Sequence, residues 1–293
     1  MIRLRATFVK LWRRGGDTFL LLPATRQVTI INCQFSIRRV FTKTTATVLR
    51  VSPFSRTSHV VTWLASDGRH ITTVVKGATR PKSVFLGQYD LFYTCELVFY
   101  ERERDNALRI AKECFPEKPR SNLRLNWRAA QCAGWFATLA REVSENSPPD
   151  PALHKLLDET LDAISASPTS PPSPLVFARY EAKLLALCGL RPNFAPCPHC
   201  GKSDMSFNLA AGSRHCHEHS ERRPYDPIID IKPELAALFD KCANSQLPTL
   251  NFQPSTPNPQ LVPLLRFLGL FLRLHLDGVN TAGRAIALDS LKI

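Results

Sequence analysis

Two pairs of potential metal ligands restrict the fold of this chain more than any other feature. Cys197 and Cys200 are separated by two residues, as are Cys216 and His219, and fifteen residues lie between the pairs. This spacing is typical of two loops whose four side chains close tetrahedrally around a zinc ion. We therefore predict a zinc knuckle within residues 195–220. Because four protein ligands leave no coordination position open, we expect the zinc to be structural.

The identity of the fourth ligand has alternatives. His199, His215 and His217 lie near His219 in the sequence. His217 is adjacent to Cys216 and cannot easily share its metal. A chance gathering of cysteines and histidines on a polar loop is the competing interpretation, but the spacing fits a zinc site better. We assign Cys197, Cys200, Cys216 and His219 as the ligands.

Length and charge indicate more than one domain and a polyanionic partner. A chain of 293 residues exceeds what one hydrophobic core usually serves, so two or three domains are expected. Residues 1–130 hold 23 Lys and Arg against 9 Asp and Glu, a net charge of +14, whereas residues 131–293 have a net charge of −1. Such segregation is typical of a nucleic-acid-binding or acidic-membrane-binding domain joined to a neutral domain that binds another partner.

The sequence favours a cytoplasmic protein. The most apolar stretch, Leu264 to Leu276, is interrupted by Arg266 and Arg273 and is too short to span a bilayer. The apolar run Phe19 to Ala24 is too short for the hydrophobic region of a signal peptide. Nine cysteines, six of them scattered, do not form a disulfide framework, so free thiols in a reducing compartment are expected.

Residues 1–43 form a basic extension in our interpretation. They contain nine basic residues and one acidic residue, Asp17, with little periodicity. A basic arm, an arginine-rich targeting peptide and an upstream start codon are the three interpretations. We favour an appended or mis-started segment, because a domain begins clearly at Thr44.

Residues 44–120 are predicted to form a small β-barrel that binds DNA. Short strands are expected at 46–51, 59–65, 69–76, 91–100 and 107–114, and Asp67-Gly68 is a strong hairpin turn signal. Five strands in about 70 residues are typical of the five-stranded barrel called the OB-fold.

Residues 121–293 are predicted to form a helical domain that holds the zinc knuckle. Helices are expected at 123–143, 152–164, 175–187, 233–242 and 260–276, with proline-rich connections between them. In the first helix we place Leu125 on the apolar stripe. The fold class is therefore α+β, with an N-terminal barrel followed by helices.

The candidate DNA contacts lie in the barrel. The third strand ends in a loop that carries Lys76, Arg80 and Lys82, and such a loop can follow a sugar-phosphate backbone. The aromatic residues Trp63, Phe54 and Tyr89 could offer stacking faces, but for each of them a place in the barrel core is the better expectation. The predicted DNA-binding residues are Arg50, Arg56, Lys76, Arg80 and Lys82.

No motif nominates a catalytic site. Gly201-Lys202-Ser203 resembles the end of a phosphate-binding loop, but position 196 is proline where that motif needs glycine. His217-Glu218-His219 does not have the spacing of a metalloprotease, and no paired carboxylates or serine and histidine constellation appears. We do not expect an enzyme.

Several motifs together resemble the bacterial recombination mediator family RecO. The resemblance extends from about Thr44 to the C-terminus. Besides the Cys197/Cys200 pair, the motifs are Thr47-Val48-Leu49-Arg50, Lys76-Gly77-Ala78, Arg80-Pro81-Lys82-Ser83, Tyr180-Glu181, Lys183-Leu184-Leu185, Cys188-Gly189-Leu190 and Leu274-His275-Leu276-Asp277-Gly278. The sequence departs from the family in residues 1–43 and in His219, where a cysteine is often found.

The resemblance implies a role in recombinational repair. RecO-like proteins bind single- and double-stranded DNA, anneal complementary strands, contact the acidic tail of the single-strand binding protein, and act with RecR to load RecA. For the tail we expect a site on the helical domain with Arg179, Lys183 and Arg273 at its basic edge. An RNA-binding protein with a barrel and a zinc knuckle is the alternative, and a zinc enzyme is a third, weaker one.

Overall fold

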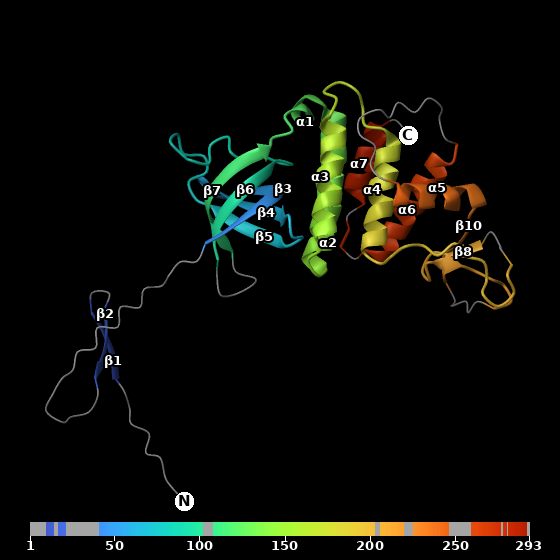
Figure 1. The fold of residues 1–293 in the computed structure, drawn as a ribbon, viewed down its shortest axis with the longest axis horizontal. Helices are drawn as coiled ribbons and strands as arrows, with labels where there is room; N and C mark the ends of the chain where they lie inside the picture. The colour runs from blue at the N-terminus through green and yellow to red at the C-terminus, as the bar shows by residue number, and fades with distance from the viewer. Residues whose placement is uncertain are drawn as a thin grey trace, which may run out of the picture. The chain divides into compact units, whose positions relative to one another are not determined.

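The computed structural model describes residues 10–14, 17–21, 41–101, 108–202, 206–219, 225–245, 259–276, 278–279 and 281–291. The chain divides into two compact units, Met1–Val40 and Phe41–Ile293. In the first unit, strand β1 (Lys10–Arg14) pairs in antiparallel fashion with β2 (Asp17–Leu21). All further elements belong to the second unit (Figure 1).

Five strands of the second unit close into a barrel. They are β3 (Phe41–Ser55), β4 (Ser58–Ala65), β5 (His70–Val75), β6 (Thr94–Tyr100) and β7 (Arg109–Lys118). Their order around the barrel is β3-β4-β5-β7-β6, and only the β5–β7 pair is parallel. The long strand β3 closes the barrel because its first half pairs with β6 and its second half with β4. The predicted α+β class with a five-stranded OB-type barrel is confirmed.

The strand bounds differ from the sequence prediction at three places. Strand β3 begins at Phe41, so the barrel includes residues that we had assigned to the extension. Strand β6 begins only at Thr94, because Leu91 to Tyr93 belong to the preceding loop. Strand β7 runs on to Lys118, and residues 102–107, where we expected its start, lie outside the described residues.

Seven helices follow the barrel among the described residues. They are α1 (Asn122–Leu125), α2 (Trp127–Asn146), α3 (Pro151–Ser165), α4 (Pro174–Leu187), α5 (Pro233–Asn244), α6 (Leu261–His275) and α7 (Ala282–Ser290). Prolines begin α3, α4 and α5, where the missing N–H would have no partner in the helix. Helices α2 and α3 contact the barrel, and α4 packs against α3, α5 and α6 (Figure 1).

Two parts of the helical prediction were wrong. The helix predicted over 123–143 is interrupted at Asn126, which ends α1 and caps α2 with its side chain. The interruption changes the helical register, so Leu125 is exposed and does not lie on the apolar stripe. Helix α7 was not predicted.

Polar side chains join the barrel to α3. Arg120, between β7 and α1, is buried. Its guanidinium donates to the carbonyl of Phe92 at 2.7 Å and to Thr94 Oγ1 at 2.9 Å. On the helix side it donates to Asp158 Oδ1 at 2.5 Å and to Asp162 Oδ1 at 2.7 Å. One cation thus holds the start of β6 and the middle of α3 at the same time.

The environment of Asp158 keeps this network charged. Burial acts to raise the pKa of Asp158, but hydrogen bonds from Lys118 and Thr94 and the charge of Arg120 outweigh it and lower that pKa to about 2. For the imidazole of His154, one turn earlier on α3, burial has the opposite effect and lowers the pKa. At neutral pH the network therefore contains an ionised carboxylate and a neutral imidazole.

A second buried ion pair holds α7 in place. Arg284 donates through Nε to Glu181 Oε1 at 2.7 Å and through Nη2 to Glu181 Oε2 at 2.8 Å. The same carboxylate accepts from Trp135 Nε1 at 2.9 Å, and Arg284 also donates to the carbonyl of Leu265. A Cβ on Gly269 would lie 2.5 Å from this guanidinium, so glycine provides the space for it. The pair connects α7 to α2, α4 and α6.

Two of the sequence predictions concern disulfide bonds and membrane-spanning segments. The eight cysteines within the described residues are all free thiols. In the same part of the chain, every helix is too short or too polar to cross a membrane.

The turn at Gly68 lies close to the backbone that leads into α3. Gly68 has a positive φ of 86°, and a Cβ there would lie 2.3 Å from the backbone nitrogen of Asp150, the residue before α3. We predict that Gly68→Ala lowers the free energy of unfolding by about 1–2 kcal/mol through backbone strain and by a further 1–3 kcal/mol or so through the clash. Thermal and urea unfolding measure this loss.

Gly87→Ala is the matched control. Gly87 also has a positive φ, 75°, but a Cβ there would meet no atom within 4 Å. The control should therefore show the strain without the clash. Equal destabilisation by the two substitutions would contradict the close packing of the turn on α3.

Candidate metal centre and nucleic-acid interface

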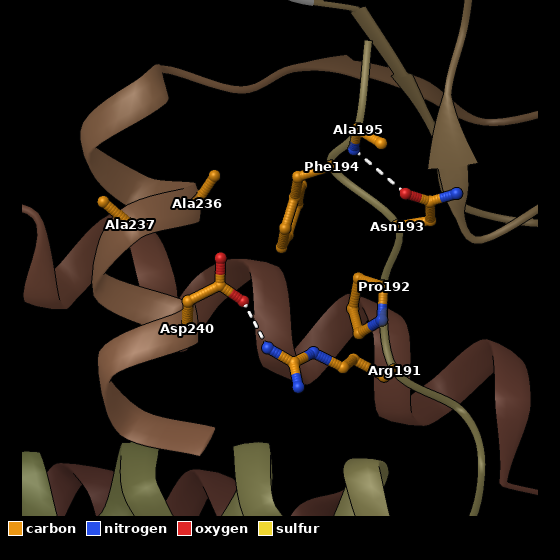
Figure 2. Close-up of a pocket in the computed structure, with 8 residues that line it drawn as sticks. All are labelled: Arg191, Pro192, Asn193, Phe194, Ala195, Ala236, Ala237 and Asp240. Atoms are coloured by element: carbon orange, nitrogen blue, oxygen red, sulfur yellow. Dashed lines mark hydrogen bonds and ion pairs between the residues drawn. The ribbon is translucent and has the colours of Figure 1, made fainter. Parts of the chain in front are cut away.

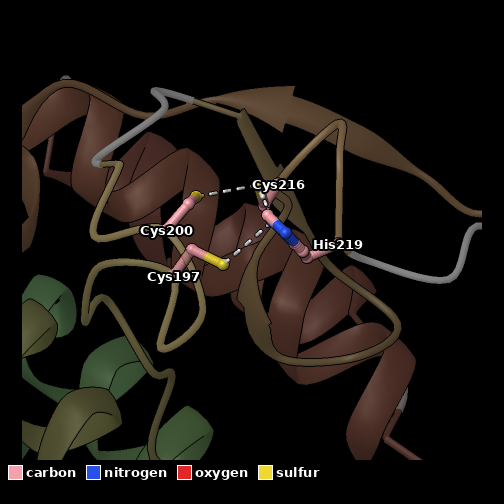
Figure 3. Close-up of side chains that lie close together, drawn as sticks. All are labelled: Cys197, Cys200, Cys216 and His219. Carbon is pink, nitrogen blue, oxygen red and sulfur yellow. Dashed lines mark hydrogen bonds between the residues drawn. The ribbon is translucent and has the colours of Figure 1, made fainter.

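The four predicted metal ligands converge (Figure 3). The ligand atoms of Cys197, Cys200, Cys216 and His219 all lie within 4.8 Å of one another. Cys200 Sγ is 3.6 Å from Cys216 Sγ, and His219 Nδ1 is 3.6 Å from Cys216 Sγ and 3.9 Å from Cys197 Sγ. Ligands of a tetrahedral zinc ion with Zn–S bonds of about 2.3 Å stand about 3.8 Å apart. The donor set and its spacing therefore fit zinc, and the cluster could hold a metal ion.

Short loops and a small sheet position the ligands. In the first loop, the Gly201 N–H donates to the carbonyl of Cys197 at 2.8 Å, and Gly201 has a φ of 68°, which favours glycine. The second loop follows β9 (Ser213–Arg214), in a sheet of order β10-β8-β9 with β8 (Ser206–Asn208) and β10 (Ile228–Asp230). The sheet brings the second ligand pair to the first.

The other histidines near the cluster are not among its four members. His199 stacks on His219 with ring centroids 5.4 Å apart, and His215 meets the ring of His217 edge-on at 5.2 Å. Within the described residues, His219 is the histidine that completes the group.

The hydrogen bonds of the cluster favour thiolates at two positions. The backbone N–H of Cys200 lowers the pKa of Cys197, and the hydrogen bond with His219 lowers the pKa of Cys216. The backbone N–H of Lys202 acts to lower the pKa of Cys200, but burial and the neighbouring thiols outweigh it and raise that pKa. A metal ion needs all three sulfurs deprotonated and would supply the missing positive charge.

The predicted DNA-binding cations lie on the barrel surface. Lys76, Arg80 and Lys82 belong to the loop after β5, and Arg56 lies in the turn between β3 and β4. Backbone contacts tie that loop to the turn, since the Thr79 N–H donates to the carbonyl of Thr57 at 3.2 Å. The loop and the turn therefore share one end of the barrel.

Arg50 completes this set of five. It lies on β3, next to a β-bulge and opposite Thr62 of β4. Arg50, Arg56, Lys76, Arg80 and Lys82 are all exposed. Within the described part of the chain, none of the five is paired with a carboxylate. We call these five residues the barrel cations.

Of the three aromatic candidates, one is available for stacking. Trp63 is fully buried and donates to Thr73 Oγ1, and Tyr89 packs on the barrel core with its hydroxyl 2.7 Å from His59 Nδ1. For Phe54 the expected core position was wrong, because its side chain is 58% exposed. Phe54 lies near the end of β3, two residues before Arg56 in the turn that follows.

The three predicted partner-binding cations differ in exposure. Arg179 and Lys183 lie on α4, and Arg273 lies on α6, which packs against α4. Arg179 is only 4% exposed, whereas Arg273 is exposed. Lys183 is half-buried, and burial lowers its pKa. Among the three, Arg273 presents its charge most openly.

A pocket near the metal loops was not predicted. It has a volume of about 600 Å³ and lies between α5 and the segment from Arg191 to Ala195. Figure 2 shows the ring of Phe194 directed into this space, opposite Ala236 and Ala237 of α5. Arg191 Nη2 lies 2.7 Å from Asp240 Oδ1 at one edge. The residues that form it are about 45 positions apart, so no local sequence pattern indicated it.

Comparison with known proteins identifies the family. The model of the family described as "Recombination protein O C terminal" matches residues 124–284, which is more than half of the chain. The chain belongs to the RecO family. The match spans α2 to α6 and includes the metal cluster.

Curated RecO proteins are similar over most of the chain. The DNA repair protein RecO of Rhodopirellula baltica is 28% identical over 235 residues, 76% of this chain and 83% of that protein. That of Alkaliphilus metalliredigens is 25% identical over 251 residues, 84% and 98% of the two chains. That of Bacillus subtilis is 24% identical over 202 residues, 68% and 76% of the two chains.

The metal cluster of this RecO chain leads to a prediction about His219. We expect one zinc ion per chain, and we expect His219→Ala to lose it, because three sulfurs alone leave the tetrahedral site incomplete. Loss of zinc should lower the melting temperature. Metal analysis of the purified protein and thermal unfolding with and without a chelator measure both effects.

His217→Ala is the matched control. It removes an exposed imidazole two residues away that is not among the four ligand groups, so zinc content and melting temperature should stay as in the wild type. A His219→Ala protein that keeps its zinc, or a wild-type protein that contains none, would overturn the assignment.

Proposed function

We propose that this RecO family member is a recombination mediator in DNA repair. It binds single- and double-stranded DNA, anneals complementary strands and, with RecR, helps to load RecA onto strands covered by single-strand binding protein. The observation that carries the proposal is the set of five exposed barrel cations, none of which pairs with a carboxylate among the described residues, on an OB-type barrel in a chain of this family. The names of the relatives, DNA repair protein RecO, support it.

Contacts of the barrel with DNA would be mainly electrostatic. The barrel cations are free to neutralise phosphates, and the release of counterions from DNA then drives binding. Phe54, next to Arg56, would add a stacking face for an unpaired base. A protein working in this way on chromosomal DNA belongs in the cytoplasm, associated with the nucleoid.

The proposal does not include bond-making chemistry. Annealing pairs two strands and breaks no covalent bond. The four ligand groups of the metal cluster would fill the coordination sphere of zinc, which then has a structural role. The alternative function, RNA binding by a barrel with a zinc knuckle, would show as a preference for RNA over single-stranded DNA of equal length.

The single-strand binding protein offers an acidic tail, and two places on the helical region could receive it. The sequence pointed to α4 and α6, with Arg179, Lys183 and Arg273. The pocket beside Phe194 has a mixed polar and apolar lining and carries one cation, Arg191, at its edge. We favour the pocket, because an apolar chain end could enter it while a carboxylate of the tail replaces Asp240 as the partner of Arg191.

We expect three of the barrel cations to account for part of the affinity for single-stranded DNA. Replacing Lys76, Arg80 and Lys82 together by Ala should weaken binding to single-stranded DNA and flatten its salt dependence. Three lost phosphate contacts reduce the slope of log affinity against log salt by about 2. Fluorescence anisotropy with a labelled oligonucleotide at several salt concentrations measures the slope.

A second triple variant controls for net charge. Lys155, Lys232 and Lys241 are exposed cations of the helical region, and replacing them by Ala removes the same charge far along the chain. Its slope should match the wild type. If both triple variants change the slope equally, general attraction and not this loop accounts for binding.

We expect the pocket beside Phe194 to bind the acidic tail through Arg191. Arg191→Ala should weaken binding of an acidic peptide with an apolar C-terminal end by about fivefold, the effect of losing one ion pair at a surface. Asp240→Asn should tighten binding, because the peptide no longer competes with Asp240 for Arg191. Titration calorimetry with the full chain measures both.

Arg273→Ala distinguishes the two places. If Arg273→Ala weakens peptide binding while Arg191→Ala and Asp240→Asn leave it unchanged, the tail binds at α4 and α6. The full chain is the proper sample, since Arg120 and the α3 carboxylates join the barrel to the helices.

A further inference from the structure

The junction of α1 and α2 presents a large aromatic side chain to solvent. Trp127 is 59% exposed and Leu125 is 73% exposed, whereas Trp63 and Trp135 are buried. Large apolar side chains that are exposed next to one another often mark a surface that contacts a partner. The proposed function uses neither Trp127 nor Leu125.

Hydrogen bonds of Asn126 hold this junction rigidly. Its Oδ1 accepts from the N–H of Ala129, the first-turn residue of α2, at 3.2 Å. Its Nδ2 donates to the carbonyls of Ser167 and Ser170, at 3.3 and 2.7 Å. Because the side chain of Asn126 is buried and satisfied, the two neighbouring side chains are directed outward. Trp127 is thus presented by a fixed backbone.

Two arginines accompany the exposed ring. The guanidinium carbon of Arg128 lies 5.0 Å from the centroid of the Trp127 ring. Arg124 is exposed, lies 5.5 Å from the ring centroid of Tyr93, and pairs with Asp90. An exposed indole beside a guanidinium group offers a stacking face for an unpaired base and a cation for its phosphate, as in proteins that bind single strands.

The junction is connected to the barrel cations through one loop. The segment between β5 and β6 begins with Lys76 and ends at Tyr93. Its first part carries Lys76, Arg80 and Lys82, and its last part contacts Arg124 through Asp90 and Tyr93. Figure 1 shows α1 where the chain passes from the barrel to the long helices.

We propose that Trp127 is a second base-stacking site, which extends the path of single-stranded DNA from the barrel to the start of α2. Arg128 contacts a phosphate beside the stacked base. Duplex DNA is not held there, because its bases are already stacked on one another. This inference rests on the proposed DNA-binding function and adds a site to it.

Tryptophan fluorescence tests the stacking directly. The probe is an oligothymidylate of about 30 nucleotides, longer than the roughly 4–16 nucleotides that one OB barrel covers. In a Trp12→Phe background, binding should quench the emission of Trp127, while the buried Trp63 and Trp135 stay unaffected. Trp127→Phe should abolish the quenching and keep most of the affinity, since phenylalanine also stacks.

Trp127→Ala should reduce the affinity for this oligonucleotide roughly 5- to 150-fold, the effect of losing one stacked base. Leu125→Ala is the matched control, since it removes an exposed apolar side chain that cannot stack and should leave the affinity unchanged. An unchanged melting temperature in each variant shows that folding is intact.

Three outcomes would overturn the stacking site. Trp127→Ala could bind as the wild type does, or Leu125→Ala could lose as much affinity as Trp127→Ala. The third is that Trp127→Ala binds DNA normally but no longer anneals strands covered by single-strand binding protein, which would identify a protein contact. In all three cases the Lys76, Arg80 and Lys82 variant still tests the barrel, so the proposed function stands or fails separately.

Discussion

One buried guanidinium, that of Arg120, joins the barrel, which carries the barrel cations, to the helical region, which carries the metal cluster and the pocket beside Phe194. It connects the start of β6 with the two carboxylates on α3, and it is fully surrounded by acceptors. Its backbone has a φ of 41°, in a region that residues other than glycine seldom adopt. A buried cation is stable only when its hydrogen bonds are complete, so removal of one partner leaves a costly charge. Arg120 therefore holds the barrel against α3 with a single side chain.

Another buried guanidinium, that of Arg284, has the same role within the helical region. It binds Glu181 on α4 in a two-point arrangement, and Trp135 of α2 donates to the same carboxylate. Arg284 approaches Gly269 of α6 so closely that a side chain at that position would meet its guanidinium. A continuous core of α2, α4 and α6 thus supports the metal loops and the pocket beside Phe194.

Sequence patterns within short windows predicted local structure, but they did not predict contacts between residues that are far apart in the chain. Three features depend on residues that lie close together in the chain, and each was predicted. They are the strand that forms β5, the Asp67-Gly68 turn and the spacing of the four ligands. Glu181 and Arg284 are 103 positions apart, so their pairing left no trace in any window. The capping role of Asn126 was not predicted, because polar residues are common within helical stretches. Once it is recognised as a cap, the exposure of Leu125 and Trp127 follows.

Among the described residues, the positive charge of the first 130 positions includes two kinds of cation. Arg120 and Lys118 are paired with carboxylates of α3, and Arg124 is paired with Asp90, so these residues hold the structure together. The barrel cations have no such partner among the described residues, and their mutual repulsion opposes folding. A surface that keeps unpaired charges at one end of a barrel is less stable than one that mixes both signs. Polyanion binding removes that repulsion, and this physical gain connects the charge asymmetry of the sequence to a function on DNA.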